Sequence, residues 1–296
     1  MKYLSVAEVA KRWGVSARTV RNYCAAGKIP DAFLVGKTWN VPETAQRPDR
    51  ANKKRAAPKT LLDVLRDEKG GKVSGGIYHK VQIELTYNSN HIEGSKLTHD
   101  QTRYIYETNT IDMADGAVNV DDIVETVNHF RCIDMAIDAA NRPLSEAFIK
   151  GLHATLKSGT RDSRKDWFAV GEYKKLPNEV GGMETTPPEQ VAEQVKLLLS
   201  SYSGRKVKTL SELLEFHVAF ESIHPFQDGN GRVGRLILFK ECLRNSIVPF
   251  IIDENLKLFY YRGLQEWGTE QGYLTGTCLT AQDQFKSYLD YFRIPY

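Results

Sequence analysis

Residues 209–245 read TLSELLEFHVAFESIHPFQDGNGRVGRLILFKECLRN, and this stretch decides the fold of most of the chain. Apolar residues recur with helical spacing in LLEFHVAF and again in RLILFKECL, which predicts two buried helices. The glycines and the proline of HPFQDGNG, between these two runs, are typical of a loop. The sequence therefore predicts a mainly α-helical unit in which this loop joins two core helices.

The loop offers groups suited to a bound phosphate chain. Gly229, Asn230 and Gly231 come just before a helix N-terminus, where backbone N–H groups and the partial positive charge of the helix end favour an anion. Arg232 and Arg235 are three residues apart on that helix, so both should project from nearly the same face toward one polyphosphate. Together these residues predict a nucleotide-binding site.

Two further residues of the loop indicate group transfer. Asp228 carries hard oxygen ligands of the kind that hold Mg²⁺ against phosphates. His224 can take a proton from an attacking hydroxyl. Taken singly, such features are commonly structural: a histidine after a helix is often a cap, and GNG is often a turn. Their occurrence together predicts nucleotide-dependent group transfer.

HPFQDGNGRVGR, residues 224–235, resembles the Fic signature H-x-F-x-[DE]-G-N-G-R-x-x-R at every fixed position, and the resemblance extends over about residues 60–296. It implies a helical domain that transfers AMP from ATP to a hydroxyl of a target protein. It also implies that His224 deprotonates the hydroxyl, Phe226 anchors the loop and Asp228 holds Mg²⁺. The phosphates would then be held by Gly229, Asn230, Gly231, Arg232 (β-phosphate) and Arg235 (γ-phosphate).

Upstream, SNHIEG (residues 89–94) resembles the family's inhibitory pattern [ST]-x-x-x-E-[GN]. Ser89 and Glu93 are four residues apart and should lie on one face of a helix. A Glu93 carboxylate aimed at Arg235 would form a bidentate pair and occupy the guanidinium that should hold the γ-phosphate. The sequence thus predicts an enzyme inhibited by its own chain, with a surface capping role for Glu93 as the alternative.

The run NEVGGMETT predicts a β-hairpin, because two short extended runs flank a pair of glycines. In the family the corresponding hairpin, here about residues 173–186, lies over the active site and pairs with an extended segment of the target by strand addition. A surface hairpin without a role is the alternative. The expected architecture is therefore a mainly α domain with a small β-hairpin flap.

Charge separates the first sixty residues from the rest. They hold 13 Lys and Arg against 4 Asp and Glu, whereas the remaining residues hold 27 against 33. Ser5 and Ser16 can each cap a short amphipathic helix, and IPDAFLVGKTWNVP predicts a small hairpin, or wing. This head resembles the winged helix-turn-helix of the MerR and excisionase type.

The resemblance implies that the head binds duplex DNA, with a protein-binding module as the alternative. We expect the DNA phosphates to be contacted by Arg18, Arg21, Lys28 and Lys37. The predicted organisation is a winged helix-turn-helix domain over residues 1–45, a linker rich in proline, alanine and basic residues over 46–60, and a Fic domain over 61–296.

The four cysteines are far apart in the sequence and form no CxxC pair, so neither a zinc site nor a disulfide framework is indicated. No apolar stretch is long enough to cross a bilayer, and the first residues lack the apolar region of a signal peptide. These features predict a cytoplasmic protein with reduced, buried thiols and no membrane partner. They do not decide whether it forms a homo-oligomer.

Two other functions stay open at this point. One is a transcription regulator whose Fic domain only senses nucleotide, against which His224 argues, because a sensor needs no base. The other is a Fic enzyme that uses another nucleotide, or that removes AMP with help from Glu93. The pocket for the nucleotide base is not confined to the motif, and Tyr260 and Tyr261 are the candidates for it.

Overall fold

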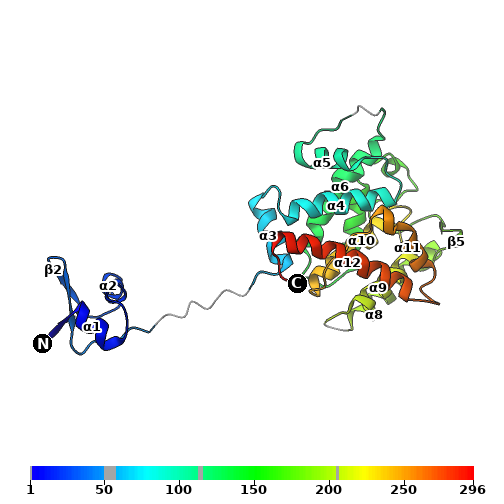
Figure 1. The fold of residues 1–296 in the computed structure, drawn as a ribbon. Helices are drawn as coiled ribbons and strands as arrows, with labels where there is room; N and C mark the ends of the chain where they lie inside the picture. The colour runs from blue at the N-terminus through cyan, green and yellow to red at the C-terminus, as the bar shows by residue number, and fades with distance from the viewer. Residues whose placement is uncertain (1, 50–57, 113–115, 205–206) are drawn as a thin grey trace. The chain divides into compact units, whose positions relative to one another are not determined.

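The computed structural model describes residues 2–49, 58–112, 116–204 and 207–296. Contacts between residues divide the chain into two units, residues 1–57 and 58–296 (Figure 1). Residues 50–57, which form most of the predicted linker, lie outside the described residues.

The first unit is a small helix-turn-helix domain with a three-stranded antiparallel sheet in the order β1-β3-β2. Ser5 caps the first helix and bonds with Glu8 in a capping box, Gly14 ends that helix at φ 64°, and Ser16 caps the second helix. The predicted caps at Ser5 and Ser16 are confirmed. The elements are β1 (Tyr3–Ser5), α1 (Val6–Trp13), α2 (Ala17–Ala25), β2 (Phe33–Val35) and β3 (Thr38–Pro42).

A compact apolar core holds this first unit together. It consists of Val6, Val9, Ala10, Val20, Cys24, Ile29 and Val41, which come from both helices, from the segment after α2 and from β3. Strands β2 and β3 pair as the predicted wing, with Val35 opposite Thr38 and with Gly36 and Lys37 in the turn between them. The core therefore fixes the second helix and the wing of this unit with respect to each other.

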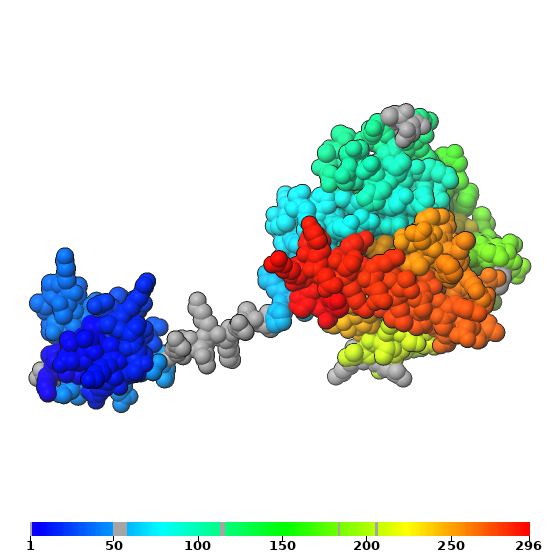
Figure 2. Space-filling model, viewed as in Figure 1, coloured from blue at the N-terminus to red at the C-terminus, as the bar shows by residue number. Residues whose placement is uncertain are grey.

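The second unit is built from ten α-helices and one two-stranded hairpin among its described residues. On the face drawn in Figure 2, α11 and α12 lie side by side at the surface. The helices are α3 (Leu61–Gly71), α4 (Ile77–Ile92), α5 (His99–Thr108), α6 (Val120–Asp138), α7 (Glu146–Lys157), α8 (Pro188–Ser203), α9 (Leu210–Ile223), α10 (Asn230–Arg244), α11 (Glu254–Gln265) and α12 (Gly272–Phe292). The hairpin strands are β4 (Glu179–Val180) and β5 (Met183–Glu184).

Helix α10 is the centre of this unit, and it contacts α4, α6, α7 and α9 (Figure 1). Thirteen of its fifteen residues are buried, and these include the charged Arg232, Arg235, Lys240 and Glu241 besides the apolar residues. The prediction of two core helices that flank a loop is confirmed, with α9 on one side and α10 on the other. Because the core surrounds α10, whatever the loop binds is held against a rigid helix.

Two further features of the fold concern the cysteines and the lengths of the helices. All four cysteines are free and buried, as expected: Cys24, Cys132, Cys242 and Cys278. Among the described residues, no helix combines the length and the apolar character that a membrane span requires.

Candidate active site

The loop between α9 and α10 is fastened at its middle by Phe226 and Asn230. Phe226 is fully buried, and its ring stacks on the ring of His153 at 4.0 Å. Asn230 accepts a hydrogen bond from the Phe226 backbone N–H and donates one to the Phe226 carbonyl, both at 2.8 Å. The amide side chain of Asn230 therefore closes the loop. Only the backbone N–H of this residue is left to contact an anion.

The first turn of α10 has no side-chain cap. Its N-cap is Gly229, at φ 79° and without a side chain that could cap the first N–H groups of the helix. A Cβ added to Gly231 would lie 2.3 Å from the Glu93 carboxylate, so only glycine lets that side chain lie against the first turn. The helix end is therefore without a side-chain cap, and Gly231 allows Glu93 to lie against it.

His224 stands at the end of α9 in the left-handed conformation, at φ 50°. Its Nδ1 lies 3.3 Å from the Glu221 carbonyl, which can only accept, so Nδ1 carries the proton and Nε2 keeps a lone pair. Burial lowers the pKa of His224 below its ordinary value, and the Lys174 ammonium contributes to the same shift. The imidazole is therefore neutral at pH 7 and suited to accept a proton.

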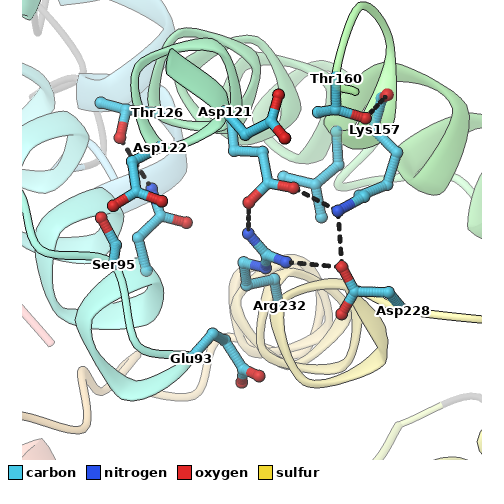
Figure 3. Close-up of polar contacts among 12 residues, drawn as sticks. Glu93, Ser95, Asp121, Asp122, Thr126, Lys157, Thr160, Asp228 and Arg232 are labelled. Atoms are coloured by element: carbon cyan, nitrogen blue, oxygen red, sulfur yellow. Dashed lines mark hydrogen bonds and ion pairs between the residues drawn. The ribbon is translucent and has the colours of Figure 1, made fainter. Parts of the chain in front are cut away.

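Asp228 belongs to a group of charged side chains around the first turn of α10 (Figure 3). Its carboxylate accepts from Lys157 Nζ at 2.5 Å and lies 3.5 Å from Arg232 Nη2. Glu125, on α6, bonds both of these cations. Burial works to raise the pKa of Asp228, but Arg232 and Lys157 together outweigh it and lower the pKa to about 2.

Arg235 is bound to the end of α4. Its Nε donates to Ser89 Oγ at 3.0 Å, and its Nη2 donates to the Ser89 carbonyl at 2.9 Å and to Glu93 Oε1 at 2.7 Å. The bidentate pair predicted for Glu93 is wrong, because Ser89 takes up much of the guanidinium and leaves Glu93 one nitrogen. Glu93 is the C-cap residue of α4, directly after its last turn.

The two arginines of the motif do not converge in this structure. Arg232 contacts Glu125 and Asp228, whereas Arg235 contacts Ser89 and Glu93. Their spacing along α10 places them near one face of the helix. A glutamate on α6 pairs with the first arginine, however, and a glutamate at the end of α4 pairs with the second. Both guanidinium groups are almost fully buried, so neither swings freely in solvent.

The predicted hairpin is present but short, with Glu179 opposite Glu184 and with Gly181 and Gly182 in the turn at positive φ. Its stem is tied to the motif loop through Lys174, a buried residue whose ammonium donates to Asn178 Oδ1 at 2.7 Å and to Thr185 Oγ1 at 2.5 Å. Asn178 in turn donates to the Phe226 carbonyl. The hairpin therefore stands beside His224.

The residues that we assigned to DNA lie in the first unit, and all four are exposed. Arg18 and Arg21 are on α2, Lys28 follows that helix, and Lys37 lies in the turn of the wing. Of the candidates for the base pocket, Tyr260 is buried with its hydroxyl 2.6 Å from His217 Nε2, whereas Tyr261 is partly exposed and bonds the carbonyl of Ile92.

Among the described residues, no three His, Cys, Asp or Glu side chains form a group that could hold a metal ion. One ionised carboxylate, Asp228, is nevertheless what a Mg²⁺ ion bound mainly by phosphates and water requires. Its side chain is 47% exposed, whereas those of Lys157 and Arg232 are almost fully buried, so a cation can reach it. The residues present therefore fit a Mg²⁺ ion that enters together with a nucleotide.

Sequence reasoning missed Glu125 and Lys157. They lie on α6 and at the end of α7, far from the motif in the chain, and neither belongs to a recognisable pattern. The residues three and four positions from Glu125 are the polar Asp121, Asp122, Asn128 and His129, so the sequence pattern does not mark a buried charged residue there. Such a residue is buried only when it has a partner of opposite charge, but the sequence does not say which partner.

The comparisons with known proteins assign a domain to each unit. Residues 143–241 match the Fic/DOC family model, and residues 3–45 match a helix-turn-helix domain model. The chain therefore contains a Fic/DOC domain, and a helix-turn-helix domain precedes it.

Relatives and solved structures agree with this assignment. A protein adenylyltransferase Fic of Drosophila grimshawi is 27% identical over 187 residues, 60% of this chain and 36% of its own length. This chain thus spans about a third of the length of such curated relatives. A Fic domain containing signaling protein of Bacteroides thetaiotaomicron is 26% identical, with a TM-score of 0.59 over 78% of this chain and 90% of its own. Fic-1 of C. elegans shares the fold, with a TM-score of 0.60 at 19% identity over 78% of this chain and 71% of its own.

Proposed function

We propose that the protein is a self-inhibited protein adenylyltransferase that moves AMP from ATP to a hydroxyl of a target protein. The observation that carries this proposal is the neutral His224 at one end of a loop whose other end is the N-terminus of α10, which no side chain caps. A base and an anion site at the two ends of one short loop suit the attack of a hydroxyl on a phosphate. The relatives named protein adenylyltransferase support the same activity.

In the proposed reaction the target hydroxyl gives its proton to His224 Nε2 while its oxygen forms a bond to the α-phosphorus. The bond between that phosphorus and the oxygen bridging to the β-phosphate breaks, and pyrophosphate leaves with the electron pair. Backbone N–H groups of Gly229, Asn230 and Gly231 would hold the α- and β-phosphates. A general base of this kind contributes roughly 10²- to 10⁴-fold in rate.

The leaving group would be bound by cations. Arg232 would contact the β-phosphate, and Arg235 would contact the γ-phosphate once it is free of Glu93. Asp228 would hold Mg²⁺, which supplies positive charge to the pyrophosphate as it departs. The ionised state of Asp228 supports this assignment, because a protonated carboxyl would not bind the ion.

Self-inhibition is the second part of the proposal. Ser89 and Glu93 together occupy Arg235, so ATP would bind without its γ-phosphate clamp and in an unproductive position. The contact lies within a single chain, which makes the inhibition independent of a partner. Removal of Glu93 should therefore release activity.

The target would enter along the β4–β5 hairpin. Val180 is exposed and the hairpin is only two strands wide, so its edges offer unpaired backbone groups to an extended segment of the target. Such pairing holds a chain by its backbone and reads little of its side chains. The hydroxyl of a serine, threonine or tyrosine would then be brought beside His224.

We further propose that the first unit binds duplex DNA, with α2 in the major groove and the wing against the backbone. The exposed Arg18, Arg21, Lys28 and Lys37 supply the positive charge that this requires. We place the protein in the cytoplasm, where ATP and reduced thiols such as its four cysteines are found.

The experiment that tests the enzymatic proposal incubates the purified full chain with ATP, CTP, GTP or UTP, each labelled at the α-phosphate. The wild type, Glu93→Gly and Glu93→Gly/His224→Ala are compared for label on the protein itself and on added lysate proteins. We expect transfer from ATP by Glu93→Gly and a loss of at least about a hundredfold in the double variant, with ATP binding retained.

The nucleotide sensor and the enzyme that uses another nucleotide each have their own outcome in this experiment. A nucleotide sensor would bind ATP and transfer no label in any variant. Transfer from CTP, GTP or UTP would show that the protein catalyses the same transfer reaction with a nucleotide other than ATP. Undiminished transfer by the variant that lacks His224 would show that this residue is not the base.

A further inference from the structure

Four charged side chains form a closed ring beside the start of α10. Glu125 Oε1 accepts from Lys157, and Glu125 Oε2 accepts from Arg232. Lys157 also donates to Asp228 Oδ2 at 2.5 Å, and Arg232 Nη2 lies 3.5 Å from the same oxygen. The ring therefore contains two carboxylates and two cations, which alternate. Two of its members, Asp228 and Arg232, belong to the motif; Glu125 and Lys157 do not.

Access to the ring is limited to one corner. The side chains of Glu125, Lys157 and Arg232 are 11%, 4% and 6% exposed, whereas that of Asp228 is 47% exposed. Figure 3 shows Lys157 and Arg232 reaching Asp228 from two different helices. A phosphate or a cation that arrives from solvent therefore meets Asp228 first.

The ammonium of Lys157 occupies the point between two carboxylates. Nζ bonds both Glu125 Oε1 and Asp228 Oδ2, and two oxygens around one positive charge are the arrangement that a bound metal ion would also take. The Lys157 ammonium is part of the same chain, so it is present at this point without having to bind from solution. It thus competes with any divalent cation for Asp228.

We propose that Lys157 is a built-in cation of the phosphate site, which holds Asp228 until a divalent cation displaces it, and that Glu125 is the positioning residue that retains Lys157 and orients Arg232. The inference rests on the role of Asp228 in the proposed function. Displacement leaves Lys157 paired with Glu125, so no buried charge is left without a partner. Divalent cations then bind weakly without nucleotide and well only together with the phosphates.

The test measures Mn²⁺ binding to the full chain in the absence of nucleotide, by titration calorimetry and by the loss of the free-ion signal in electron paramagnetic resonance. Lys157→Met should bind Mn²⁺ at least about tenfold more tightly than the wild type, because a charge-assisted contact to Asp228 is removed. Lys150→Met is the matched control: Lys150 is on the same helix and pairs with Glu146 and Glu172, away from the ring. It should leave Mn²⁺ affinity unchanged.

Three further variants complete the experiment. The gain should disappear in Lys157→Met/Asp228→Asn, and Lys157→Arg should restore weak binding because it restores the charge. Lys157→Gln, which can still donate to Glu125, should show the same gain and replaces Lys157→Met if that variant does not fold. Thermal unfolding of each variant identifies the folded ones.

Two results would overturn the inference. One is a Mn²⁺ affinity of Lys157→Met and Lys157→Gln within twofold of the wild type. The other is a gain that survives Asp228→Asn, which would place the ion elsewhere. Neither readout depends on transfer of AMP, so a failure of the adenylyltransferase proposal, seen as absent label in Glu93→Gly, is distinguishable from a failure here.

Discussion

Arg235 Nη2 lies 2.7 Å from Glu93 Oε1, and the same guanidinium donates to the carbonyl and to the hydroxyl of Ser89. Burial works against the charged form of Arg235, but the Glu93 carboxylate outweighs it and raises the pKa of this arginine. The end of α4 therefore acts as a binding site for one side chain of α10. An incoming γ-phosphate must compete with this intramolecular partner.

The first prediction concerns that competition. Glu93→Gly should raise transfer of AMP about tenfold to a hundredfold, since a hydrogen bond to a charged group contributes roughly 1.5–3 kcal/mol. The rate is measured with labelled ATP at saturating Mg²⁺. Glu93→Gln, which keeps the shape and loses the charge, should give a smaller increase.

Arg235→Ala provides the control for this prediction. It should be inactive with or without Glu93, because removal of Glu93 cannot free a guanidinium that is no longer there to bind the γ-phosphate. Equal activation by Glu93→Gly in the Arg235→Ala background would show that Glu93 does not act through this arginine.

The second prediction is a shift of the pH–rate profile. His224 faces three charged groups, of which Lys174 lowers its pKa while Glu93 and Asp228 raise it. Activity should fall as the pH drops through the depressed pKa of His224, because the base becomes protonated. Removal of the Lys174 charge makes that protonation easier, so Lys174→Met should move the acid limb of the profile to higher pH. Profiles are measured in the Glu93→Gly background.

Lys175→Met is the matched control for Lys174→Met, since Lys175 is exposed and contacts only the carbonyl of Asp166 among the described residues. Its profile should coincide with that of the parent. If Lys174→Met lowers activity without moving the acid limb, Lys174 holds the hairpin in place and does not set the pKa of His224.

The third prediction is acid lability of the helical unit. Burial lowers the pKa of His129 to about 3, of His153 to about 4 and of His217 to about 3. Their folded-state pKa values lie below the ordinary 6.5, so the unfolded chain binds more protons and stability falls as the pH drops below about 6.5. Each such proton contributes about 1.4 kcal/mol per pH unit to the slope.

Glu221 opposes this slope in part. Burial raises its pKa to about 8, so the folded state holds one extra proton between pH 4.5 and 8. Three histidines against one carboxyl still leave the free energy of unfolding decreasing toward acid, which urea titrations from pH 7 to pH 5 measure. His129→Asn should flatten the slope by about one proton. An unchanged slope would show that His129 is not buried in its neutral form.

The fourth prediction concerns DNA. Binding of the full chain to duplex DNA should weaken steeply with salt, with a slope of log K against log salt of about −3.6 if four phosphates are contacted. Arg18→Ala/Arg21→Ala should reduce that slope by about two units, whereas Lys11→Ala, an exposed basic residue on α1, should leave it unchanged. Fluorescence anisotropy at several salt concentrations gives both values. If the chain does not bind duplex DNA at low salt, the first unit is a protein-interaction module instead.

Much of the fold was predictable because short segments of the sequence determine many of its elements. The caps at Ser5 and Ser16, the loop from His224 to Gly231 and the hairpin at Gly181 depend on residues within a few positions of one another. Helical spacing of apolar residues likewise predicted that α9 and α10 are buried. These elements follow from backbone geometry and from burial, and both are properties of short segments.

The sequence by itself determined which residues can do chemistry here: the histidine, the carboxylate, the glycines and the two arginines of one loop and the helix that follows it. Only the tertiary structure decided what each of them contacts. Arg232 and Arg235 share a helix face, yet one pairs with Glu125 and the other with Ser89 and Glu93. The physical reason is that pairing of buried charges depends on how α4, α6 and α7 pack against α10, and no spacing along the chain encodes that packing.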